Sequence, residues 1–207
     1  YITQSSSILL LMAIFLPLII GIWIIPKFTK KWGVARTNQY LLVIGGLGLI
    51  LLFFFTDSMF PSELIYLPLL IAGFGLVGPL VLNDIMFFQV TDEDELKTGV
   101  RREAAFFGIN ALITKPAQSL AIVIPTALLS ISGFIPRVGP DPILSQPAAA
   151  IFAIRLFIGL IPGIALILAA IILQFYPLKG EHWAKMQEDI LILHDEKHKK
   201  LQKMTRE

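Results

Sequence analysis

Five long apolar stretches constrain the fold of this chain more than any other feature of its sequence. They cover residues 8–25, 39–55, 63–88, 104–131 and 149–176. Each is about 17 residues or longer, the length that a helix needs to cross a hydrocarbon core of about 30 Å. Prolines inside the stretches agree with this, because neighbouring groups in packed membrane helices re-satisfy the freed backbone. We therefore expect an all-α membrane protein with five transmembrane helices in contact with lipid.

The composition agrees with a membrane protein and excludes several kinds of site. Of the 207 residues, 56% are hydrophobic and 15% are charged, whereas soluble domains have about 25% charged residues. Without cysteine, the chain has neither disulfides nor thiolate metal sites. All three histidines, His182, His194 and His198, lie in the C-terminal tail, so no serine–histidine–aspartate set can be built. We expect no enzyme activity, no cofactor, no metal site and no binding of nucleic acid.

Lysine and arginine are unevenly distributed between the segments that connect the apolar stretches. They gather in residues 26–38, 89–103 and 177–207, while the connections on the opposite side carry only Arg137. Basic residues mark the cytoplasmic side of a membrane protein. We therefore expect an external N-terminus, a cytoplasmic C-terminus and a location in the cell membrane.

The tail, residues 177–207, places apolar side chains at near-helical spacing, at Trp183, Met186, Ile190 and Leu201. This pattern predicts an amphipathic cytoplasmic helix after the transmembrane part, residues 1–176. A solubilising tail without a docking site is the alternative. The odd number of helices, in a chain that starts without methionine, favours a fragment of a longer protein.

Lys115 is the one charged residue between Ala104 and Ile131. A charge at that depth costs on the order of 3 kcal/mol on insertion scales, and chains accept it where the charge faces a water-filled path or a buried partner. Lys115 lies about 12 residues, or roughly 18 Å, from Glu103 at the end of the stretch. Snorkelling to the interface is therefore the weaker interpretation, and we expect Lys115 to face a substrate cavity.

Further polar residues accompany Lys115. Gln118 and Ser119 share its helix face by their spacing, and Asn110 and Thr114 share an adjacent one. Together with Asn83 in the third stretch, they form the predicted substrate-binding set, which is Lys115, Asn110, Gln118, Ser119 and Asn83.

We expect two other intramembrane charged residues, Arg155 and Asp84, to have structural roles. Arg155 lies about seven residues, roughly 10 Å, into the last stretch, and its planar fork can bind several carbonyls or one carboxylate. We expect Asp84, near the cytoplasmic end of the third stretch, to pair with a basic residue of the adjacent connection; cation binding is the alternative. Small residues let membrane helices approach closely, so we interpret the glycines mainly as packing positions, with Gly78-Pro79 and Pro162-Gly163 as alternative hinges.

Two connecting segments carry a family resemblance. IIPKFTKKWGVART, residues 24–37, resembles the basic loop repeated in both halves of the major facilitator superfamily. VTDEDELKTGVRREAAFFGINALITKPAQSL, residues 90–120, is similar to the signature of the melibiose permease-like glycoside–pentoside–hexuronide:cation symporters. That signature has an acidic D-x-x-E-x-K segment, then an arginine and a glutamate, then a mid-membrane lysine. The matching residues here are Asp92, Glu95, Lys97, Arg101, Glu103 and Lys115.

The resemblance implies the last five helices of a twelve-helix secondary transporter, whose N-terminal helices would be partners absent from this chain. It implies cation-coupled symport of a sugar or glycoside by alternating access, with H⁺ or Na⁺ bound mainly by the N-terminal half. It also favours a cytoplasmic gate made of Asp92, Glu95, Lys97, Arg101 and Arg102, whose ion pairs form and break between states. A plain solvated loop is the alternative for this charge run.

Two other functions remain open from the sequence. The third stretch lacks the family's sugar-stacking tryptophan, and phenylalanines gather at Phe87, Phe88, Phe106 and Phe107. These features favour transport of a lipid or other amphiphile on the same fold as the alternative. An intramembrane enzyme is the remote alternative, since a Mg²⁺ diphosphate site needs two facing acidic clusters, and the sequence has one.

Overall fold

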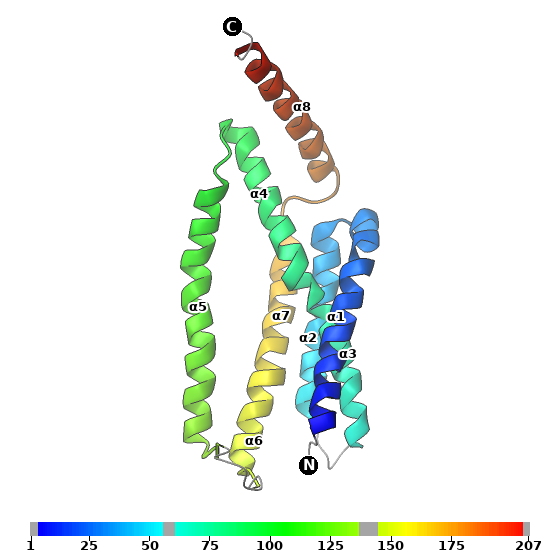
Figure 1. Ribbon diagram of the computed structural model, residues 1–207, viewed down its shortest axis with the longest axis vertical. Coiled ribbons are helices and arrows are strands. Elements are labelled where there is room, and N and C mark those ends of the chain that lie inside the picture. Colours follow the sequence, from blue (N-terminus) through cyan, green and yellow to red (C-terminus); the bar gives the residue numbers. More distant parts are fainter. Residues whose placement is uncertain (1–3, 56–60, 137–144, 205–207) are drawn as a thin grey trace.

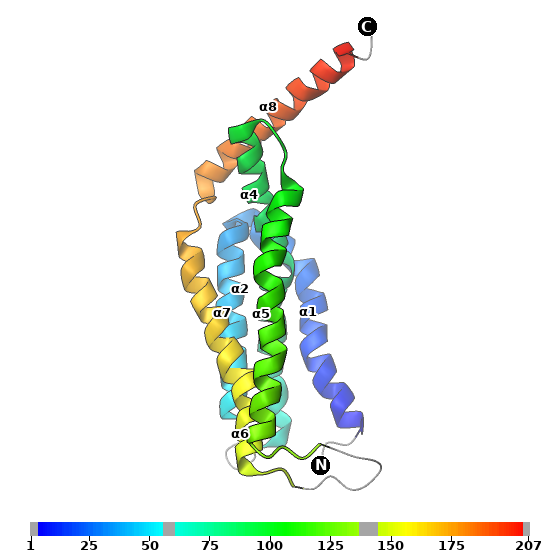
Figure 2. The ribbon, with the colours of Figure 1, turned by 90° about the vertical axis from the view of Figure 1, so that its left-hand side faces the viewer.

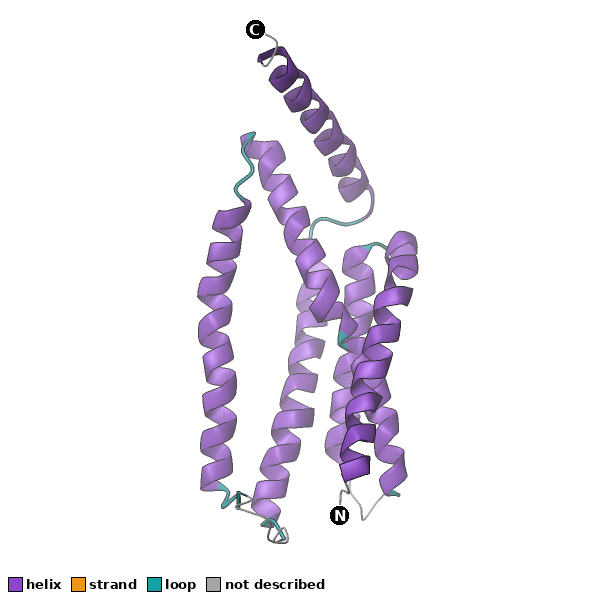
Figure 3. Ribbon diagram, viewed as in Figure 1, coloured by secondary structure: helices purple, strands orange, loops and turns teal. Residues whose placement is uncertain are grey.

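The computed structural model describes residues 4–55, 61–136 and 145–204, and in this part of the chain every regular element is helical (Figures 1 and 3). Within the described ranges, five helical spans are long and apolar enough to cross a membrane: Ile8–Trp32, Val34–Phe54, Tyr66–Thr98, Glu103–Ile131 and Ala148–Phe175. The predicted all-α membrane fold with five spans is confirmed.

The first two spans are the helices α1 (Gln4–Trp32) and α2 (Val34–Phe54), which Gly33 alone separates. Gly33 has a φ of 82°, a left-handed conformation that glycine adopts without steric cost. A connection over residues 26–38 was therefore wrong, because α2 already includes Thr37 and Asn38, both buried. The polar side chains of this segment have ordinary helix propensities, so their polarity does not end the helices.

The third span consists of η1 (Ser62–Ile65), α3 (Tyr66–Gly75), η2 (Gly78–Leu82) and α4 (Asn83–Thr98). η2 is a π-helical turn containing Pro79, and such turns often occur at functional sites. The helix continues past Phe88 to Thr98, which corrects the predicted connection over residues 89–103. Because of this extension, Asp84 lies near the middle of the third helical span, Tyr66–Thr98, and not near its end as predicted. Residues 89–98 are hydrophilic, but several are good helix formers, so the helix extends beyond its apolar part.

The remaining elements are α5 (Glu103–Ile131), then α6 (Ala148–Arg155), η3 (Leu156–Leu160), α7 (Ile161–Ile172) and η4 (Leu173–Phe175), and finally α8 (Gly180–Met204). η3 is a second π-helical turn, just before Pro162. The predicted helix in the tail is confirmed by α8.

Helix α2 lies at the centre of the bundle and packs against α1, α3 and α7. Gly45 on α2 meets Gly75 on α3, and a Cβ atom added to Gly46 would lie 2.8 Å from the carbonyl oxygen of Gly163 on α7. Any larger side chain at these positions would push the helices apart. The predicted packing role of these glycines is confirmed.

In Figure 1 helix α5 stands apart from the bundle formed by α1, α2, α3 and α7, and in Figure 2, where this side faces the viewer, α5 lies in front of α2. None of its residues is buried against the rest of the described chain. The α1–α2 and α4–α5 connections and the start of α8 lie toward one end of the molecule, here called the basic end, and α1 begins toward the other (Figure 1).

Candidate functional site

A cavity of about 630 Å³, here called the central cavity, lies between α4 and α5. Its lining includes carboxamides, a carboxylate and hydroxyls together with apolar side chains. The lining residues are Pro79, Asn83, Asp84, Met86, Phe87, Val90, Asn110, Thr114, Gln118 and Tyr176. Its volume is in the range of about 300–1,000 Å³ that is typical of small-molecule sites.

Asn83 begins α4 directly after the π-helical turn and is held by a residue of another helix. Nδ2 of Asn38 on α2 donates a hydrogen bond of 2.8 Å to Oδ1 of Asn83. Asn38 is only 1% exposed, and its own Oδ1 has no partner among the described residues. Because a buried amide is costly to leave unpaired, this contact fixes the orientation of the Asn83 carboxamide at the cavity wall.

Tyr176, directly after η4, brings the end of the last span to the same cavity. Its hydroxyl lies 3.1 Å from both the carbonyl oxygen of Met86 and Oε1 of Gln89. Gln89 is buried, so the hydroxyl ties α4 to the last span through otherwise enclosed polar groups.

The structure brings together three of the five predicted substrate-binding residues. Asn83, Asn110 and Gln118 line the central cavity, whereas Lys115 and Ser119 do not. Nζ of Lys115 donates a weak hydrogen bond of 3.5 Å to Oε1 of Gln118, and Oγ of Ser119 donates to the backbone oxygen of Lys115 at 3.2 Å. Lys115 thus lies beside the cavity, and it forms no ion pair with any described residue.

The two charges with predicted structural roles have different surroundings. Asp84 lines the central cavity and forms no ion pair with a described residue, so the structure does not contain its expected pairing with the adjacent connection. Arg155 is partly buried at the end of α6, immediately before the π-helical turn. Its guanidinium group has no hydrogen-bond partner within the described ranges, so the structure does not contain the expected hydrogen bonds of this side chain.

The predicted gate residues lie at the basic end, around the turn that joins α4 to α5. Gly99 has a φ of 73° and donates its N–H to the carbonyl oxygen of Glu95 at 2.8 Å, which ends the helix. The chain then reverses, so that Arg101 and Arg102 return to the acidic residues of α4. Lys97 instead pairs with Glu93 one turn away, at 2.6 Å.

Arg101 and Arg102 each bind carboxylates of the last two turns of α4. Nη1 of Arg101 lies 3.1 Å from both Asp92 and Glu95, and its Nε lies 3.1 Å from Glu103. Arg102 binds both oxygens of Asp94, at 2.6 and 3.0 Å. The hydrogen bond to Glu103, followed by that to Glu95, raises the pKa of Arg101 above its usual value.

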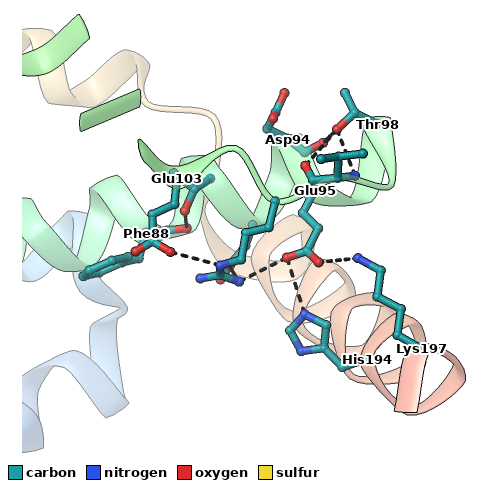
Figure 4. Close-up of polar contacts among 11 residues, drawn as sticks. Phe88, Asp94, Glu95, Thr98, Glu103, His194 and Lys197 are labelled. Carbon is teal, nitrogen blue, oxygen red and sulfur yellow. Dashed lines mark hydrogen bonds and ion pairs between the residues drawn. The ribbon is translucent and has the colours of Figure 1, made fainter. Parts of the chain in front are cut away.

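Glu95 is the centre of this network, and two residues of the tail bind it (Figure 4). Its side chain is only 3% exposed. Nζ of Lys197 lies 2.6 Å from Oε1, and Nε2 of His194 lies 3.4 Å from Oε2. Since a buried carboxylate requires charged or hydrogen-bonding partners, Glu95 links α4, the α4–α5 turn and α8.

Four residues of these sites are absent from the sequence predictions: Asn38, Tyr176, His194 and Lys197. Asn38 falls in a predicted connection, although its position one turn into an apolar helix is a usable signal. Tyr176 enters the predictions only as the end of an apolar stretch. No local pattern pointed to the tail residues, because they meet Glu95 across about 100 positions of sequence.

Comparison with known proteins gives a family. Residues 3–180 match the family described as MFS/sugar transport protein. The chain is 35% identical over 115 residues to an uncharacterized symporter of Synechocystis, a match covering 56% of this chain and 21% of that protein. It is 25% identical over 167 residues to the glucuronide carrier protein homolog of Escherichia coli, covering 81% of this chain and 35% of that protein.

A further relative is the human sodium-dependent lysophosphatidylcholine symporter 1, with 25% identity over 197 residues. This match covers 93% of the chain and 34% of the human protein. The chain therefore spans about a fifth to a third of the length of these curated relatives.

Proposed function

This chain belongs to the MFS/sugar transport protein family, and from that premise we propose that it is the C-terminal part of a secondary transporter for a sugar or glycoside. The central cavity carries the proposal. Its carboxamides, Asn83, Asn110 and Gln118, both donate and accept hydrogen bonds, as the recognition of neighbouring hydroxyl groups requires. Met86 and Phe87 supply an apolar wall for the C–H face of a sugar ring.

The sugar proposal is tested by uptake of a panel of radiolabelled glycosides and hexuronates into proteoliposomes that contain the intact protein. We expect Asn110→Leu and Gln118→Leu each to abolish uptake, because they remove cavity hydrogen bonds. Thr126→Val is the matched control, since Thr126 lies on the same helix outside the lining of the central cavity and its hydroxyl donates to the backbone oxygen of Ile122 at 2.7 Å. Uptake that survives both leucine variants would refute a substrate site at this cavity.

Lys115 serves this site from its edge. Nothing in the described chain neutralises its charge, and α5 buries none of its residues. We propose that its ammonium group contacts either an opposing helix of the same transporter or the substrate in the water-filled path. Isolated intramembrane charges are rarely left facing lipid. The further helices of a twelve-helix transporter would cover α5.

The basic end is assigned to the cytoplasm, where its network acts as a gate. In one state the ion pair of Arg101 and Glu95 holds the α4–α5 turn in place and closes the cytoplasmic path to the central cavity. In the other state the two charges separate and this path opens. Arg101→Gln should raise the labelling of cavity cysteines from the cytoplasmic side. Lys97→Gln is the control and should have little effect, because an exposed pair one turn apart contributes about 0.5 kcal/mol or less. Equal labelling in both variants would mean that these charged residues form a solvated surface and not a gate.

Coupling to H⁺ or Na⁺ completes the proposal, with cation ligands contributed mainly by the N-terminal half. Asp84 is the carboxylate that lines the central cavity of this chain. Uptake driven separately by a sodium gradient and by a proton gradient identifies the cation, and uptake that depends on neither gradient would exclude symport.

A lysolipid or other amphiphile is the second candidate cargo. Phe107 on α5 lies 5.0 Å from Phe87 and 5.8 Å from Phe88, ring centroid to centroid, and this cluster could receive an acyl chain beside the polar wall. Phe107→Ala should then abolish lysophospholipid uptake and spare sugar uptake. If the parent protein transports no lysolipid, and Phe107→Ala loses sugar uptake instead, this cargo is excluded.

A further inference from the structure

A second cavity, here called the basic-end cavity, lies where α1 meets α2 and where the chain enters α8. Its volume is about 260 Å³, and Lys31, Trp32, Arg36, Gln89, Lys179 and Trp183 contribute to its wall. It shares no lining residue with the central cavity, so the transport site does not account for it. Its volume is below the range of about 300–1,000 Å³ that is typical of whole small-molecule ligands, but a single headgroup needs less space.

The charge of the basic-end cavity is uncompensated. Among the residues that the structure describes, three cationic side chains and no carboxylate line it. Lys31 and Arg36 are exposed and form no ion pair with any residue in the described ranges. Nζ of Lys179 donates to the carbonyl oxygen of Gln174 at 2.7 Å, which leaves its charge unneutralised. A wall of this kind attracts an anion rather than a neutral ligand.

Backbone N–H groups at the same wall add hydrogen-bond donors that carry partial positive charge, like the cationic side chains. Helix α2 begins at Val34 without a side-chain cap, and Gly33 contributes only backbone to the lining. The first N–H groups of a helix have no partner within it, and they carry partial positive charge. Phosphate groups bind such helix starts, and guanidinium and ammonium groups strengthen the binding.

The position of the cavity points to a membrane lipid as the source of the phosphate. Trp32 and Trp183 stand at its wall, and tryptophan concentrates at the level of the lipid headgroups. Nζ of Lys31 lies 5.8 Å from the ring centroid of Trp32, which keeps the ammonium beside the cavity. With the basic end in the cytoplasm, the cavity meets the leaflet that holds anionic lipids, which bind to basic pockets between helices.

We propose that the basic-end cavity binds the phosphate headgroup of an anionic phospholipid, as a site separate from the transported cargo. Arg36 and Lys31 hold the phosphate, the start of α2 donates to it, and the two tryptophans pack against the glycerol region. The lipid thereby joins α1 and α2 to the segment that leads into α8.

The test uses the intact protein in detergent, with phosphatidylglycerol or phosphatidylcholine added and the retained lipid measured by native mass spectrometry. Lys31→Gln/Arg36→Gln should lower phosphatidylglycerol affinity at least about tenfold, as expected for two charges at a basic lipid site. The matched control is Lys27→Gln/Lys30→Gln, which removes the same charge from the same exposed segment outside the cavity. Arg36→Gln alone replaces the first variant if the double variant does not fold.

Each outcome decides the proposal. Selective retention of phosphatidylglycerol that only the Lys31/Arg36 variant loses supports it. Equal losses in both double variants would indicate diffuse attraction and overturn it, as would equal retention of phosphatidylcholine. Competition by inorganic phosphate at concentrations as low as those of the lipid would assign the site to free phosphate instead. Because binding is measured without transport, a failed sugar proposal would leave this result unaffected.

Discussion

Replacing Lys115 by leucine separates a functional charge from a membrane anchor. Lys115 lies about 18 Å from the Glu103 end of α5 and about 24 Å from the Ile131 end, at 1.5 Å per residue. It is exposed and has no ion-pair partner in the described chain. Neither end of the helix is within easy reach of a lysine side chain, so its charge remains at membrane depth.

The magnitude follows from this depth. A lysine near the helix centre costs on the order of 3 kcal/mol to insert, which corresponds to about a hundredfold in the insertion equilibrium. Lys115→Leu should therefore insert at least as well as the parent sequence, and a single-span insertion assay of residues 103–131 should show the gain. Sugar uptake by the intact protein should nevertheless fall to background, because the charge that served the cavity is gone.

Two further variants make the interpretation unambiguous. Lys115→Arg keeps the charge but replaces a compact ammonium by a planar fork, so it should restore uptake poorly. Lys97→Leu, the control for uptake, removes an exposed lysine of another helix that pairs with Glu93 rather than with Glu95, and it should leave uptake unchanged. Near-normal uptake by Lys115→Leu, with Arg also tolerated, would refute the cavity role and leave a snorkelling anchor.

Three other predictions concern packing and orientation. A double-mutant cycle of Asn38→Ala and Asn83→Ala, measured by unfolding in detergent, should give a coupling energy of about 0.6 kcal/mol, because this is the average for side-chain hydrogen bonds between membrane helices. A coupling energy of zero would mean that this contact does not stabilise the fold. Gly75→Leu should lower the free energy of unfolding by about 1–3 kcal/mol by forcing α3 away from α2, whereas Gly108→Ala, which has open space around it among the described residues, should cost less than Gly75→Leu. A cysteine at Ser145, exposed at the end opposite the basic end, should react with an impermeant thiol reagent in intact cells, and labelling only by a permeant reagent would reverse the assigned orientation.

Much of the candidate site could be predicted from local spacing, and the remainder could not. The helical period put Asn110 and Thr114 on a face adjacent to that of Gln118, and the structure has all three at one cavity. The same period put Lys115 on the face of Gln118, but a single helix cannot show which of its faces meets α4. Only the packing of α5 opposite α4 made one face the cavity wall and left Lys115 at its edge.

The sequence by itself determined the five spans and the charge difference between the two ends, because long apolar stretches and clustered basic residues act through composition and local order alone. Tertiary structure alone decided the contact of Asn38 with Asn83 and the meeting of Glu95 with His194 and Lys197. These features depend on which helices lie side by side and on how the left-handed turn at Gly99 reverses the chain. A contact between residues about 100 positions apart has no local signal, because it exists only once the intervening helices are packed.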